Sequence, residues 1–101
     1  MAKKLGILVS SDEHLGHLLG IVEAANKAGV EVTVFLTAYG VLLTQQPDFA
    51  KLEGKAQVSL CNVGFESFKL SKPVPVVKDE DFATQMRHAM MIEECDRYIV
   101  L

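Results

Sequence analysis

The sequence predicts a three-layer α/β/α sandwich around a mostly parallel sheet of about five strands. Short aliphatic runs occur at intervals along the chain and suit strands that are buried on both faces. Segments with helical spacing of apolar residues follow several of these runs. The 101 residues match the length of one domain, so we take 1–101 as a single domain.

The first strand is expected at 5–9, where aliphatic residues dominate. A helix is predicted over 13–28 because apolar residues recur there at helical spacing: Leu15, Leu18, Leu19, Val22 and Ala25. Ser10 and Glu13 have the spacing of a capping box at the start of this helix. Gly29 ends it, and the strand that follows is expected to lie parallel to the first.

The rest of the chain continues the alternation of strands and helices. We expect, in order, a strand at 30–36, a short helix at 38–44, a helical turn within 49–54, a strand at 56–61, a short helix at 62–70, a short strand at 76–77, a helix from 79–81 to about 94, and a last strand at 96–101. Three carboxylates at 79–81 favour a helix start there. Phe82, Met86, Ala89 and Met90 are expected on one side of that helix.

Composition excludes several classes of function. The net charge is −3 and no basic stripe is visible, which argues against nucleic acid as a partner. The apolar runs are too short for a membrane span or a signal peptide, so we expect a cytoplasmic protein without membrane contact. No nucleotide-binding motif is present, and the two cysteines cannot form a zinc site alone. We therefore expect neither a metal nor a cofactor.

Ligands of open α/β sheets bind where the strands end at their carboxyl side. Three predicted strand ends fit this rule, at 10–14, 37–40 and 61–64. Cys61 is the candidate catalytic residue among them. The candidate binding residues around it are Ser11, His14, Tyr39, Asn62 and Gly64.

Cys61 stands where a predicted strand gives way to a helix. A helix N-terminus presents free N–H groups and the positive end of the dipole, which favour the nucleophilic thiolate. Alternatively, Cys61 is a plain buried cysteine that acts as a small hydrophobic side chain. Cys95 precedes the last strand and is expected at the opposite edge of the sheet, too far away to form a disulfide with Cys61.

His14 and His17 have the spacing of neighbours on one helix face, but no third metal ligand accompanies them. Solvent-exposed helix histidines are the simpler interpretation, although His14 could orient or protonate a sulfur species at Cys61. Tyr39 could line a pocket at the same edge or serve only in packing.

Four segments together carry a resemblance to a known family: 5–11, with its opening strand; 24–35, with its passage from helix to strand; 58–62, which contains Cys61; and 95–101, with its terminal strand. On these segments the chain resembles the DsrE/DsrF-like family of small sulfur-relay proteins. The resemblance covers nearly the whole chain and depends on the order and length of the elements.

The resemblance implies a compact α/β sandwich that assembles as a trimer or hexamer. It implies that Cys61 accepts sulfur from a donor protein as a persulfide and passes it to an acceptor protein. Sulfur-carrying members often have a basic residue soon after the cysteine, whereas here the next one is Lys69. The alternative is a non-catalytic assembly or small-ligand-binding subunit of the same fold, suggested by the abundance of aliphatic and methionine residues.

Overall fold

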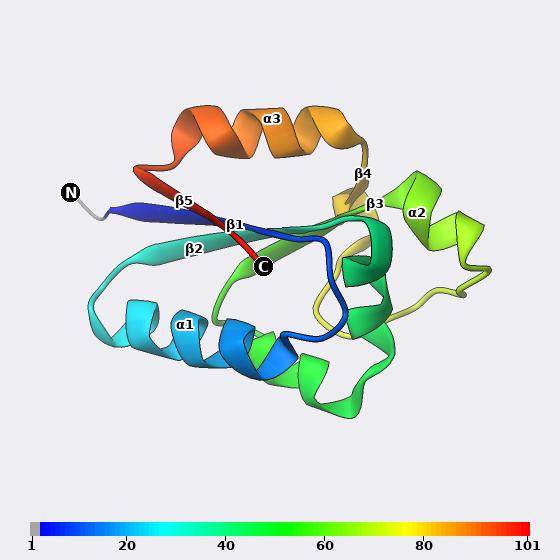
Figure 1. Ribbon diagram of the computed structural model, residues 1–101, viewed down its shortest axis with the longest axis horizontal. Helices are drawn as coiled ribbons and strands as arrows, with labels where there is room; N and C mark the ends of the chain where they lie inside the picture. Colours follow the sequence, from blue (N-terminus) through cyan, green and yellow to red (C-terminus); the bar gives the residue numbers. More distant parts are fainter. Residues whose placement is uncertain (1–2) are drawn as a thin grey trace.

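The computed structural model describes residues 3–101 and has a five-stranded sheet in the order β4-β3-β2-β1-β5 (Figure 1). All four strand pairings are parallel, as predicted. The strands are β1 (Lys4–Val9), β2 (Glu31–Leu36), β3 (Gln57–Cys61), β4 (Phe82–Ala83) and β5 (Arg97–Val100). The predicted α/β sandwich is therefore confirmed.

Helices cover both faces of the sheet (Figure 1). Helix α3 (Gln85–Glu94) lies on one face, while α1 (Leu15–Lys27) lies on the other. Between β2 and β3 the chain forms two 3₁₀ helices, η1 (Ala38–Gln45) and η2 (Pro47–Leu52). The short helix α2 (Asn62–Ser67) continues directly from the end of β3.

The two faces of the sheet differ in chemistry. Successive residues of a strand point to opposite faces, and Gly6 identifies the α3 face because a Cβ there would lie 3.1 Å from Met91 Cγ. The α1 face is aliphatic and fully or nearly fully buried: Ile7, Val9, Val32, Val34, Leu36, Val58 and Leu60. The α3 face carries polar side chains at alternate positions: Lys4, Glu31, Thr33, Gln57 and Ser59. The main hydrophobic core therefore lies between the sheet and α1.

The first helix begins later than predicted. It starts at Leu15 with His14 in the N-cap position, and no side chain caps it. The predicted capping box of Ser10 and Glu13 is wrong, because the Glu13 N–H donates to Ser11 Oγ at 3.1 Å in the bend before the helix. The predicted stop is confirmed, since Gly29 follows the helix with a φ of 75°.

The start of the last helix was also predicted incorrectly. Residues Asp79–Asp81 form a separate 3₁₀ turn, η3, and Phe82 and Ala83 form β4. Helix α3 begins only at Gln85, where the N-cap residue Thr84 accepts a hydrogen bond from the Met86 N–H at 3.2 Å. The hydroxyl group of Thr84, and not the three carboxylates at 79–81, therefore marks the start of this helix.

Two further expectations about this region are wrong. The segment 76–77 is not a strand, although Val77 is buried. Phe82 does not lie on the helix with Met86, Ala89 and Met90; these three are exposed on α3, and the buried residue of this helix is Met91. Phe82 lies in β4 and packs edge-on against Phe65 of α2, with ring centroids 5.0 Å apart.

Candidate functional site

Cys61 occupies the junction that was predicted for it. It is the last residue of β3 and the N-cap residue of α2, in an extended conformation. Its side chain is half-buried, and its thiol is free of any disulfide. Cys61 is thus not among the fully buried residues of the core.

A second helix also begins beside Cys61. Cys61 pairs with Ala83 of the neighbouring strand β4, and the next residue after Ala83 is Thr84, the N-cap of α3. Strand alternation directs the Cys61 side chain to the α3 face, in line with Ser59. The sulfur is thus on the side of the sheet where α3 starts, and α2 starts from its own backbone.

Helix N-termini carry N–H groups without intrahelical partners and a partial positive charge. Groups of this kind favour an anion over a neutral species within the first turn. Cys61 lies at one such helix start and beside another, and the residue is neither fully buried nor fully exposed.

Two predicted neighbours of Cys61 lie in the first turn of α2. The Asn62 side chain donates to Glu66 Oε1 at 3.1 Å, while its own Oδ1 is buried without a partner among residues 3–101. Gly64 faces η1, and a Cβ there would lie 3.5 Å from Val41 and 3.9 Å from the Cys61 Cβ. A methyl group at this position would make ordinary van der Waals contacts, and Gly64 itself offers no side chain for binding.

Tyr39 extends from η1 toward the same end of the molecule. Its ring lies against Phe68, the C-cap residue of α2, with centroids 5.7 Å apart. The side chain is 61% exposed, so it belongs to the surface around α2 and not to an enclosed pocket.

Ser11 and His14 lie on the chain between β1 and α1 and keep to local contacts. Ser11 accepts from the Glu13 N–H, and the His14 ring meets the His17 ring at 5.5 Å. Neither side chain forms a hydrogen bond or ring contact with α2 in the described part of the chain. Residues 3–101 also contain no group of three or more His, Cys, Asp or Glu side chains arranged to hold a metal ion.

Cys95 lies at the opposite edge of the sheet, as predicted. It follows α3 directly, two residues before the start of β5, where Arg97 pairs with Leu5 near the start of β1. Its thiol donates to the Ile92 carbonyl at 3.6 Å. Cys61 and Cys95 are thus separated by the length of the strands.

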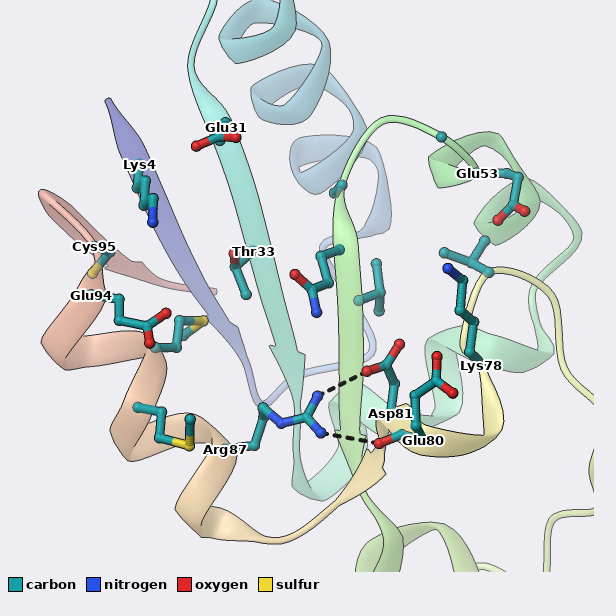
Figure 2. A pocket seen from close by; sticks show the side chains of 17 residues that line it. Lys4, Glu31, Thr33, Glu53, Lys78, Glu80, Asp81, Arg87, Glu94 and Cys95 are labelled. Carbon is teal, nitrogen blue, oxygen red and sulfur yellow. Dashed lines mark hydrogen bonds and ion pairs between the residues drawn. The ribbon is translucent and has the colours of Figure 1, made fainter. Parts of the chain in front are cut away.

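Sequence reasoning missed a large groove on the α3 face, shown in Figure 2. Its volume is about 900 Å³, and it lies between α3, the strands β1 to β3, and the segment that includes η3. The signal was present in the alternation of β2 and β3, where Glu31, Thr33 and Gln57 occupy positions facing the helix layer. A closed helix layer would require apolar residues at these positions.

Comparison with models of protein families found no match, and comparison with curated proteins found none either. None of the helices within residues 3–101 combines the length and the apolar content that crossing a bilayer requires.

Proposed function

We propose that this chain is a sulfur carrier that accepts sulfur as a persulfide on Cys61 and passes it to a partner protein. The observation that carries the proposal is the position of a partly exposed cysteine between the starts of α2 and α3. The resemblance to DsrE/DsrF-like proteins favours the same chemistry at the same residue. Both cysteines are free thiols, which suits a reducing compartment such as the cytoplasm.

The transfer needs no oxidant. The Cys61 thiolate attacks the outer sulfur of a donor persulfide, R–S–SH, and a new S–S bond forms as the donor's own S–S bond breaks. The donor leaves as the thiolate R–S⁻, and Cys61 becomes Cys61–S–SH. In the second step an acceptor thiolate attacks the outer sulfur, and the Cys61 thiolate is released.

Transfer between proteins requires a docking surface next to the sulfur. Exposed apolar side chains are present on each element that surrounds Cys61: Tyr39 on η1, Val63 on α2 and Met86 on α3. Val63 and Met86 are 72% and 68% exposed and lie in the first turns of α2, which begins at Cys61, and of α3, which begins beside it. Apolar surface of this kind favours a protein partner.

Mass spectrometry of the intact chain tests the proposal. After incubation with glutathione persulfide and removal of the excess, the wild-type chain should gain one sulfur atom. Cys61→Ala should lose this gain, and Cys95→Ala is the matched control that should keep it. No gain in the wild type, or a gain that survives in Cys61→Ala, would overturn the proposal.

A second candidate function is assembly of identical subunits, which the resemblance places at three or six copies. It is favoured by exposed apolar side chains on α3 and the edge strand β5: Met90, Ile92, Tyr98 and Val100. Tyr98 and Val100 lie on the edge strand β5, with β1 and β2 between β5 and the strand β3 that carries Cys61, so assembly and sulfur transfer are compatible.

A further inference from the structure

The outer face of α1 has charges that match a second copy of the same helix. Glu13 precedes Gly20 by seven residues, and Lys27 follows Gly20 by seven. His17 precedes Gly20 by three residues, and Glu23 follows it by three. All four side chains are exposed. Each acid thus lies as far from Gly20 as a cation or a hydrogen-bond donor does on the other side, so the face is complementary to its own reversed copy.

This pattern specifies the direction of the partner helix. In a two-fold antiparallel pair with Gly20 on the axis, each position faces the position equally far beyond Gly20. Glu13 then faces Lys27 of the second copy, and Lys27 keeps its pair with Glu23 of its own chain at 3.5 Å. A parallel two-fold pair would place each charge against itself, which is unfavourable. The charges therefore favour antiparallel pairing of two copies.

The centre of the same face is open in the single chain. Gly16, Gly20 and Ala24 lie along one side of α1 at intervals of four residues, opposite to the buried residues of the helix. They are exposed and belong to the lining of a shallow depression: Glu13, Gly16, His17, Gly20, Ile21 and Ala24. A Cβ on Gly16 or Gly20 would meet nothing within 4 Å. The charges at 13 and 27 thus flank a surface with almost no side chains.

Nothing in the fold of the single chain requires the two glycines. Neither Gly16 nor Gly20 has a positive φ, and neither is approached by another element. Glycine is unfavourable inside a helix, and its usual benefit is to let another backbone come close. An antiparallel second copy supplies that backbone at the place where the charges match.

We propose that the outer face of α1 is an interface between two copies of this chain. The α1 helices pack antiparallel across Gly16, Gly20 and Ala24, and an ion pair between Glu13 of one copy and Lys27 of the other stabilises each end. Helices α1 and α3 cover opposite faces of the sheet (Figure 1), so this interface uses none of the exposed side chains of α3. It is also independent of the chemistry of Cys61.

Exchange of the two charges tests the proposal by sedimentation equilibrium. The background is Ile92→Glu/Val100→Lys, so that α3 and β5 contribute no association. Glu13→Lys and Lys27→Glu should each weaken dimerisation about tenfold, because like charges then meet at both ends of the interface. Glu13→Lys/Lys27→Glu should recover most of the affinity. In one chain these residues are about 20 Å apart along the helix axis, so recovery requires contact between copies.

Lys51→Glu is the matched control, since it reverses the lysine of another exposed local pair and changes the net charge equally. It should leave the dissociation constant unchanged. Three results would overturn the proposal: a monomer at high concentration in the background variant, an exchanged double variant as weak as the single variants, or equal weakening by Lys51→Glu. All substituted side chains of α1 and η2 are exposed, and circular dichroism verifies folding.

Carbodiimide cross-linking adds a measurement that does not depend on charge repulsion. The reagent joins a carboxylate and an amine in direct contact as an amide, with loss of water. A covalent dimer should form in which the peptide with Glu13 is linked to the peptide with Lys27. Glu13→Gln should abolish this link. A dimer whose links join other residues only would contradict the proposed interface.

Discussion

At the scale of single residues, the fold depends on places where a side chain is absent. A Cβ on Gly40 would overlap the carbonyl oxygen of Val9, so η1 can lie against the end of β1 only because this residue is glycine. The Thr37 N–H donates to the same carbonyl at 2.9 Å. By contrast, a Cβ on Gly20 of α1 would meet nothing within 4 Å. The same residue type is thus required in one place and dispensable in the other.

Gly40→Ala should therefore lower the free energy of unfolding by about 1–3 kcal/mol or more, because backbone must move to admit the methyl group. Gly20→Ala is the control and should raise it by about 0.5–1 kcal/mol through better helix propensity. Urea denaturation of both variants measures the difference. Equal stability of the two variants would contradict the close approach of η1 and β1.

The Asp81–Arg87 ion pair is a second feature at this scale. Asp81→Asn keeps the shape of the side chain but removes the charge that Arg87 contacts at 2.8 Å. Because the Arg87 side chain is 31% exposed, solvent compensates in part, and we expect a loss of about 1.5–3 kcal/mol. Thermal and urea unfolding measure it, with Asp48→Asn at the exposed pair with Lys51 as the control that should change little.

At the scale of elements, the sequence predicted best where a single strong signal was present. Aliphatic runs identified β1, β2 and β3, and Gly29 identified the end of α1. The helix starts were predicted poorly, because Ser10 with Glu13 and the acids at 79–81 fit common start patterns that tertiary contacts override. Asp81 is used for the ion pair with Arg87, and Phe82 is placed against Phe65. A two-residue strand such as β4 has no periodicity that could reveal it.

The corrected start of α3 leads to a prediction. Thr84→Ala removes the hydroxyl that accepts from the Met86 N–H and should lower the free energy of unfolding by about 1 kcal/mol. Asp79→Asn changes an exposed residue outside the helix and should leave stability nearly unchanged. Chemical denaturation compares the two variants. A larger loss of unfolding free energy in Asp79→Asn than in Thr84→Ala would instead support a helix that starts at 79–81.

For the candidate site, the sequence was sufficient to predict that Cys61 lies at the junction of β3 and α2. It could not predict that β4 brings the start of α3 to the same place, because that depends on the Cys61–Ala83 pairing between distant segments. The sequence placed Ser11 and His14 near Cys61 because all three follow strands that end at the same edge of the sheet. In the structure Ser11 and His14 contact only residues near the start of α1 in the hydrogen bonds and ring contacts of the described residues.

At the scale of the whole molecule, Cys61 and the groove lie on the same side of the sheet. Cys61 lies at the carboxyl edge with exposed apolar neighbours, and the groove lies between α3 and the polar residues of β1 to β3. The remaining exposed apolar side chains are on α3 and β5, and β5 is an edge strand. An exposed strand edge with apolar side chains is a natural place for copies of a chain to associate.

Association through this surface is the prediction at this scale. We expect the wild-type chain to form a trimer or hexamer, and Ile92→Glu/Val100→Lys should shift it toward the monomer in light scattering coupled to size-exclusion chromatography. Both residues are about half exposed in the single chain, so circular dichroism should show retained folding. A wild-type chain that is already monomeric at high concentration would contradict the prediction, as would a double variant that keeps its assembly.

The central claim is that Cys61 carries sulfur, and peptide mapping of the wild-type chain tests it most directly. The chain is loaded with glutathione persulfide, alkylated and digested, and the position of the extra sulfur is then located by mass spectrometry. We predict that the peptide containing Cys61 holds the extra sulfur and that an added acceptor thiol removes it. Extra sulfur on Cys95 alone, or on neither cysteine, would contradict the account.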